Sequence, residues 1–320
     1  MVHSLLLAVA LTQSPPPAAP SQPAQQPPVT IGDEVQLKKP NNGTPEKTNP
    51  NRPLRVGVVP SLGQGADKES AALATYLAKE LGTKVQPELF ENHDAEANAL
   101  VAGRIDLAWM PPYQGFNAKL GGAQPISKLV RKGATTYRSV FFVRADSKIQ
   151  KLSDVHGATV GWVEANSATG HLFPLAMVAR EHLTPSQLFK DERYLGTHDA
   201  VCKAVWDKKV EVGATLADEA GPDGKLAIDG CKHSLGANAA KLRVVAVSEP
   251  VPNDVFSVRQ GLDPALVQKL QAVLAALPSS PAGKAVLKDD LKADGVTNFQ
   301  SGDFDGVQHA LEAAADVEGK

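Results

Sequence analysis

The sequence has little of several features that mark particular classes of protein. Its 320 residues include two cysteines and 5% aromatic side chains, and the formal net charge is only -2. A near-neutral chain lacks the basic field that nucleic-acid binding usually needs. Few aromatic rings argue against a sugar-stacking site, and the cysteines and histidines do not have the spacing of a zinc site. We therefore expect no nucleic-acid partner, no metal and no cofactor.

The chain starts with a short apolar run, from Leu5 to Leu11, which is too short to cross a bilayer. We interpret residues 1–13 as a signal peptide; a wrongly assigned start or a disordered tail are the alternatives. No cysteine follows the run to carry a lipid anchor, so we expect a secreted protein in the periplasm or another extracytoplasmic place. There, Cys202 and Cys231 could form one disulfide, although two separate buried thiols fit the sequence equally well.

The next stretch, residues 14–53, is rich in proline, glutamine, asparagine and threonine. Its proline runs favour extended polyproline conformations. Such a segment has too few apolar side chains to bury a core. We predict that residues 14–53 form a disordered linker.

From Leu54 onward, short apolar runs alternate with amphipathic runs at helical spacing, which indicates βαβ units on mostly parallel sheets. Two such series, with two crossings of the chain between them, predict two lobes with a cleft. We assign residues 54–143 and 248–320 to lobe 1 and residues 144–247 to lobe 2. The predicted strands are 54–59, 85–90, 105–109, 126–130, 137–143, 158–163, a stretch near Tyr194, 210–215 and 242–247. The predicted helices are 69–81, 94–102, 113–120, 172–182, 198–207, 262–277 and 305–317.

The most informative segment, residues 166–174, lies between a predicted strand and a predicted helix. The first turn of a helix leaves N–H groups unpaired and carries partial positive charge, so it binds tetrahedral oxyanions. Ser167 and Thr169 add two hydroxyl groups there, although helix capping alone also favours serine and threonine at such a place. We predict that this turn binds a small phosphorus oxyanion.

Motifs in a particular order then point to a family. The chain holds Arg55-Val56-Gly57-Val58-Val59-Pro60, Asp106-Leu107-Ala108-Trp109 with Pro112-Tyr113, Ser167-Ala168-Thr169-Gly170, His198-Asp199-Ala200, Val210-Glu211-Val212-Gly213-Ala214 and the segment 248–254. Over about residues 54–277 it resembles the phosphate, phosphite and phosphonate substrate-binding proteins of ABC transporters. The resemblance implies the α/β, two-lobed fold of type II periplasmic binding proteins. Each lobe is then a mixed, mostly parallel sheet flanked by helices, with the cleft between the lobes.

The same resemblance implies which residues bind the ligand. Ala168 departs from the family pattern, since it replaces a hydroxyl residue, and the family's acidic position falls on residues 213–215 without a clear match. His198 opens a helix, where the dipole favours a neutral imidazole. The implied ligand-binding residues are Ser61, Tyr113, Ser167, Ala168, Thr169, Gly170 and His198.

We therefore expect an extracytoplasmic solute-binding protein that closes on phosphonate, phosphite or phosphate and delivers it to an ABC permease. It is expected to be a monomer and not an enzyme, with no catalytic residue. One alternative is a sensing domain of the same fold that feeds a membrane receptor or kinase. Another is an enzyme that uses His198 on a phosphorylated small molecule, but the sequence offers no partner for that histidine. The sequence leaves open which oxyanion is bound and which acidic residue, if any, completes the site.

Overall fold

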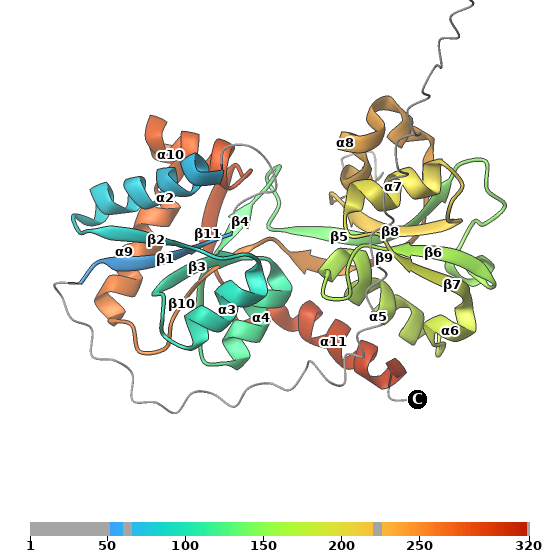
Figure 1. Ribbon diagram of the computed structural model, residues 1–320, viewed down its shortest axis with the longest axis horizontal. Helices are drawn as coiled ribbons and strands as arrows, with labels where there is room; N and C mark the ends of the chain where they lie inside the picture. Colours follow the sequence, from blue (N-terminus) through green and yellow to red (C-terminus); the bar gives the residue numbers. More distant parts are fainter. Residues whose placement is uncertain (1–51, 60–65, 220–225, 319–320) are drawn as a thin grey trace, which may run out of the picture.

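Two α/β lobes lie side by side in the computed structural model, which describes residues 52–59, 66–219 and 226–318 (Figure 1). The predicted signal peptide, almost all of the predicted linker and Ser61 lie outside the described residues. Each lobe is built on one sheet with helices packed against it, as expected for the type II fold.

The first lobe holds a six-stranded sheet in the order β11-β4-β10-β3-β1-β2. β1 pairs in parallel with β2 and β3, whereas β10 and β11 pair antiparallel with their neighbours. Its strands are β1 (Leu54–Val58), β2 (Val85–Leu89), β3 (Leu107–Met110), β4 (Gln124–Val130), β10 (Val255–Val258) and β11 (Gly295–Asn298). Its helices are α2 (Ala66–Leu81), α3 (His93–Val101), α4 (Pro112–Leu120), α9 (Pro264–Ala275) and α10 (Pro281–Ala285).

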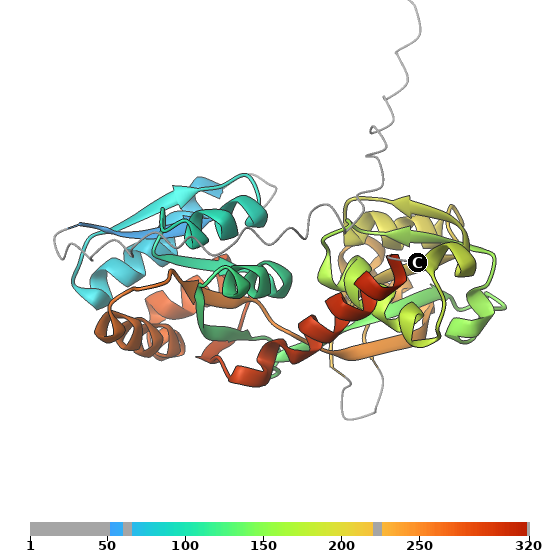
Figure 2. The same cartoon turned by 90° about the horizontal axis from the view of Figure 1, so that it is seen from below.

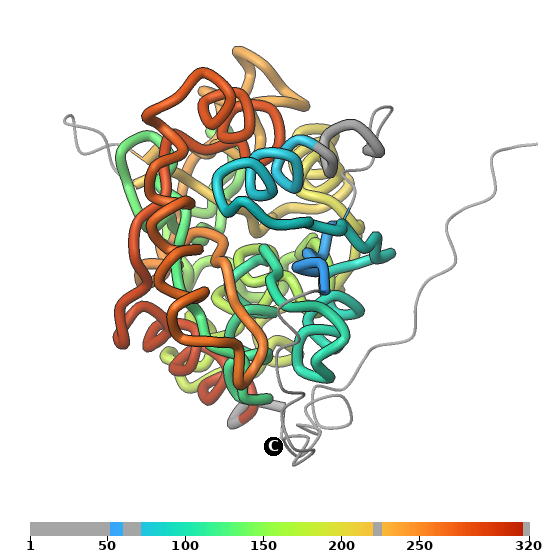
Figure 3. The backbone as a smooth tube through the Cα atoms, turned by 90° about the vertical axis from the view of Figure 1, so that its left-hand side faces the viewer, coloured from blue at the N-terminus to red at the C-terminus, as the bar shows by residue number. Residues whose placement is uncertain are grey.

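Distant parts of the chain make up this lobe. Figure 3 shows the early segments, in blue and teal, beside the late ones, in orange and red. β10 inserts between β3 and β4, and α2 packs with α9 in one apolar core that includes Leu77 and Leu270, both fully buried. Burial of such side chains stabilises the lobe by about 1.5–3 kcal/mol for each large aliphatic group.

The second lobe holds a five-stranded sheet in the order β7-β6-β8-β5-β9. Trp162 lies fully buried on it, with its ring centroid 5.7 Å from that of Phe141 and 5.5 Å from that of Phe189. The strands are β5 (Thr136–Arg144), β6 (Ala158–Trp162), β7 (Phe189–Tyr194), β8 (Val212–Ala217) and β9 (Leu242–Pro252). The helices are α5 (Phe173–Arg180), α6 (Pro185–Leu188), α7 (His198–Trp206) and α8 (Lys232–Leu235).

Three segments of the chain join the lobes: β5, β9 and the C-terminal helix α11 (Asp305–Glu318). Figure 2 shows α11 running from the first lobe onto the second, where it packs against α5. β5 and β9 pair along their lengths, from Thr136 opposite Pro252 to Arg144 opposite Leu242. Pairing thus places all of β5 in the second sheet, whereas our division assigned residues up to 143 to lobe 1. The lobe boundaries themselves stay a prediction.

Both sheets are mixed, and parallel pairing is limited to β1 with its neighbours and β6 with its neighbours. The expectation of mostly parallel sheets therefore holds only for strands joined by helical crossovers. Strands that return from the other lobe, such as β10, enter without such a crossover and run antiparallel.

The two cysteines form a disulfide, which resolves the alternatives left open by the sequence. Cys202 on α7 bonds to Cys231, with their Cα atoms 5.4 Å apart. Both side chains are fully buried. The bond fixes α7, and hence the helix start at His198, to the segment that follows β8.

Candidate functional site

The 167–170 turn is separated from the end of β6 by four residues and opens a helical segment, Ala168–Leu172, that continues into α5. Ser167 caps this segment, and its Oγ accepts a hydrogen bond of 3.1 Å from the N–H of Gly170. A Cβ on Gly170 would lie 2.3 Å from Cγ2 of Val163, so only glycine fits this close approach. The local sequence thereby shapes a tight helix start at the end of a buried strand.

Two backbone N–H groups at this helix start lack an acceptor among the described residues. The N–H groups of Ala168 and Thr169 have no hydrogen-bond acceptor within the described part of the chain, whereas those of His171 and Leu172 bond to the carbonyl of Ser167. Unpaired first-turn N–H groups together with the helix dipole are suited to an anion. The hydroxyl of Ser167 accepts from Gly170 and still has its own proton to donate.

Thr169 differs from the other members of the turn because it is 3% exposed. Its side chain is hydrogen-bonded with Tyr137 of β5, and its carbonyl accepts a 2.8 Å bond from the Ser139 hydroxyl. These bonds tie the turn to a strand that joins the lobes. A ligand role for the Thr169 hydroxyl stays a prediction, since this group already has a partner.

His198 is the first residue of α7, after Thr197, whose Oγ caps the helix by accepting from Ala200 N–H at 3.1 Å. Its Nδ1 lies 2.8 Å from Oγ1 of Thr215 near the end of β8. Loss of solvent lowers the pKa of His198 to about 4, against the opposing charge of Asp199. The ring is therefore neutral at pH 7, as expected.

Three parts of the candidate site in lobe 2 lie at the same edge of its sheet. The 167–170 turn follows β6, His198 follows β7, and Thr215 lies near the end of β8, while these three strands run parallel. Ligands of open α/β sheets collect beyond such carboxyl ends. Thr215, fully buried, lies in the stretch where the family has an acidic residue.

In lobe 1, Tyr113 is half-buried at the second position of α4, just beyond the end of β3. Its neighbour Gln114 donates a 3.1 Å bond from Nε2 to Oδ1 of Asp94 on α3. Asp94 Oδ2 accepts a second bond, of 2.7 Å, from Nδ2 of Asn166 in lobe 2. The residues beside Tyr113 and beside Ser167 thus meet at one carboxylate.

Sequence reasoning missed a polar cluster at the start of α3. His93 Nδ1 lies 2.9 Å from Oε2 of Glu96, and the His93 ring packs edge-on against Trp109 at 6.4 Å. Burial raises the pKa of Glu96, against the opposing effect of His93. Glu96 Oε1 and the indole N–H of Trp109 are buried without a hydrogen-bond partner in the described structure. The His-x-x-Glu spacing at a helix start was the available signal.

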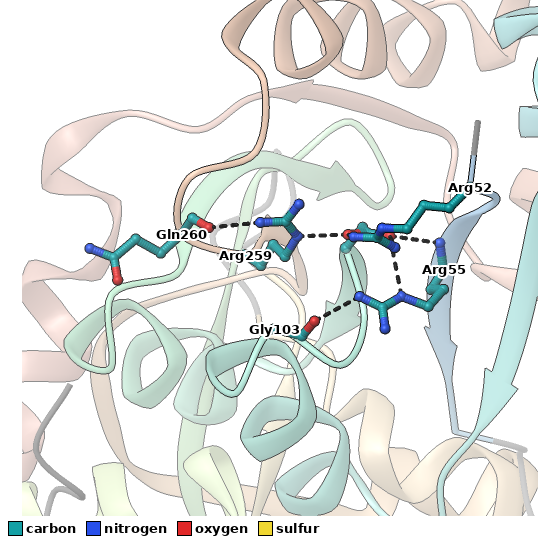
Figure 4. Close-up of polar contacts among 6 residues, drawn as sticks. Arg52, Arg55, Gly103, Arg259 and Gln260 are labelled. Atoms are coloured by element: carbon teal, nitrogen blue, oxygen red, sulfur yellow. Dashed lines mark hydrogen bonds and ion pairs between the residues drawn. The ribbon is translucent and has the colours of Figure 1, made fainter. Parts of the chain in front are cut away.

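Asp106 belongs to the fold rather than to this site. It precedes β3, at the opposite end of that strand from Tyr113. Its carboxylate accepts bonds of 2.8 and 2.7 Å from Arg52, 2.7 Å from Arg259 and 2.9 Å from the backbone of Arg55, the three arginines that Figure 4 labels. Burial opposes the ionised form, but these donors prevail and lower the pKa of Asp106.

The described ranges hold neither a metal centre nor a membrane-spanning helix. No group of three or more His, Cys, Asp or Glu side chains there could hold a metal ion. Nor does any helix among those residues have the length and apolar character needed to span a membrane. A surface hollow of about 690 Å³ beside Gly82 and Lys84 is lined by none of the predicted ligand residues that the structure describes.

Comparisons with known proteins agree with this architecture. The family model of the periplasmic substrate-binding protein of phosphonate ABC transporters matches residues 56–304. The phosphate-import protein PhnD of Mycolicibacterium smegmatis is 27% identical over 262 residues, which cover 75% of this chain and 78% of that protein.

Solved structures show the same fold. XAC2383 from Xanthomonas citri, bound to chloride ion, has a TM-score of 0.69 at 22% identity and covers 83% of this chain and 98% of its own. PhnD1 from Prochlorococcus marinus, in complex with methylphosphonate, has a TM-score of 0.61 at 20% identity and covers 81% of this chain and 97% of its own. The chain belongs to the family of periplasmic substrate-binding proteins of phosphonate ABC transporters.

Proposed function

We propose that this protein captures a small phosphorus oxyanion between its lobes and delivers it to an ABC permease. The observation that carries the proposal is the pair of N–H groups at Ala168 and Thr169, which have no partner among the described residues and lie at the same sheet edge as the neutral His198. Burying an anion is costly unless each oxygen finds a donor. Here the helix start supplies those donors without a charged side chain.

The donor set indicates the kind of anion. Two backbone N–H groups and the Ser167 hydroxyl come from the turn, and Tyr113 approaches from lobe 1. His198, being neutral, offers one N–H and no full charge. Such a set suits a compact tetrahedral oxyanion held by hydrogen bonds, and it leaves no need for a cofactor or for a catalytic step.

The place and partner of the protein follow from the same proposal. Binding proteins of this family work outside the cytoplasm with ABC permeases, and we assign both features to this chain as a monomer. The buried disulfide between Cys202 and Cys231 supports an oxidising compartment. No observation favours the sensor or the enzyme over this role.

Isothermal titration calorimetry with phosphate, phosphite and methylphosphonate tests the proposal, with sulfate as a control anion of similar shape. One relative is named as a phosphate-import protein and another as a phosphite-binding protein, and a related solved structure contains methylphosphonate. We expect one of the three to bind with a dissociation constant in the micromolar range or below. Absence of binding across all three would contradict the proposal.

A further inference from the structure

Asp94 is the carboxylate through which the two lobes meet near the candidate site. It lies in the first turn of α3, where the helix dipole favours negative charge. Oδ1 accepts from Gln114 Nε2 at 3.1 Å, and Oδ2 accepts from Asn166 Nδ2 at 2.7 Å. Gln114 belongs to α4 in lobe 1, whereas Asn166 belongs to lobe 2, so one side chain spans the gap between them.

Each partner of this carboxylate is the neighbour of a predicted ligand contact. Gln114 follows Tyr113, and Asn166 precedes Ser167. Gln114 is 7% exposed, so it holds Asp94 in one orientation within lobe 1. The bond to Asn166 then sets how closely the 167–170 turn approaches α4.

The charge of Asp94 also reaches across the lobes. Glu164, an exposed residue that precedes the turn in lobe 2, has a pKa raised by partial loss of solvent first and by the nearby charge of Asp94 second. Asn166 offers a neutral amide donor to the same carboxylate, so the direct bond between the lobes does not join two negative charges. A bond from an amide to an ionised carboxylate is about twice as strong as one between neutral groups.

We propose that Asp94 is an inter-lobe latch: by holding Asn166 it positions the 167–170 turn against lobe 1 in the closed form, without touching the ligand itself. The apparent affinity of a binding protein falls with the population of its binding-competent form. A latch that stabilises closure therefore tightens binding. The effect on affinity rests on the proposed function, whereas the effect on the shape of the protein does not.

The test compares Asp94→Ala, Asn166→Ala and the double variant with wild type, and uses Glu91→Ala as the matched control. Glu91 is an exposed carboxylate in the loop before α3, with no bond across the lobes in the described structure. Small-angle X-ray scattering gives the radius of gyration without ligand. Calorimetry gives the dissociation constant for whichever of phosphate, phosphite and methylphosphonate binds wild type.

We expect both single variants to have a larger radius of gyration and to bind about tenfold to a hundredfold more weakly. The double variant should bind no more weakly than Asp94→Ala, because the two residues share one bond. Glu91→Ala should match wild type in both measurements.

Wild-type affinity and radius of gyration in Asp94→Ala would overturn the latch, as would fully additive effects of the two substitutions. If wild type binds none of the three anions, the proposed function fails, and scattering alone decides the latch. If Asp94→Ala does not fold, Asn166→Ala, which changes a half-buried loop side chain, carries both measurements.

Discussion

Replacing Ala168 by proline removes one of the proposed ligand donors and should leave the hydrogen bonds of the fold intact. Ala168 is the first residue of its helical segment, where proline is well tolerated. Ser167 before it has φ -73 and ψ 119, in the extended region that a residue before proline prefers. The lost N–H has no acceptor in the described structure, so no internal hydrogen bond breaks.

The expected cost falls on binding. A hydrogen bond to a charged partner contributes about 1.5–3 kcal/mol, and about 1.4 kcal/mol corresponds to a factor of ten in affinity. Ala168→Pro should therefore raise the dissociation constant about tenfold to a hundredfold. The free energy of unfolding should change by less than about 1 kcal/mol, because proline also restricts the unfolded chain.

Isothermal titration calorimetry with the anion that binds wild type measures the dissociation constant. Urea unfolding of the same preparation measures the free energy of unfolding. Ala168→Gly is the control, since it keeps the N–H and loses only a methyl group, and its dissociation constant should stay within a few-fold of wild type. Ala168→Ser restores the hydroxyl that the family pattern has at this position and should bind at least as tightly as wild type. Wild-type affinity in Ala168→Pro would refute the reasoning, because it would mean that the anion does not use this helix start.

Four further predictions concern the fold. Asp106→Ala should lower the free energy of unfolding by about 3–5 kcal/mol in urea titrations, because it leaves the buried guanidinium of Arg259 without its carboxylate partner. Since the pKa of Asp106 is lowered in the folded protein, its contribution in wild type is present above the unfolded pKa and should be lost as pH falls through the folded pKa. Replacing Cys202 and Cys231 together by serine opens a loop of 29 residues and should cost about 3–4 kcal/mol, measured against wild type without reductant. His198 and His171 both have a pKa lowered to about 4 by burial, so stability should decline as pH falls from about 6.5 to 4; NMR titration that places both rings near pH 6.5 would contradict this.

Much of the element order could be predicted from the sequence because local patterns specify it. The predicted helix 198–207 matches α7 to within a residue, and the apolar run 54–59 matches β1. β10 was missed because a strand of four residues, all buried, has too little alternation to be distinguished from other apolar runs. The membership of β5 in the second sheet was also missed, since it depends on pairing with β9, about a hundred residues later.

The candidate site, too, could be predicted only in part from the sequence. A helix start rich in hydroxyl groups after a strand is visible in the sequence, and so is the histidine that opens α7. The direction of the Thr169 hydroxyl, toward Tyr137, is not visible, because its partner lies on another strand. The His93–Glu96 pair lay within reach of a spacing argument, but only burial shows that its carboxyl is shielded from water.

The sequence by itself determined the alternation of strands and helices and led to the proposals of an anion-binding turn and of an oxyanion ligand, because spacing, capping and backbone chemistry act within a few residues. Only the tertiary structure decided that Cys202 pairs with Cys231, that Thr215 faces His198, and that Asp94 of one lobe holds Asn166 of the other. These contacts join residues that are 29, 17 and 72 positions apart. They form because the packing of sheets and lobes, and not local propensity, brings such residues within bonding distance.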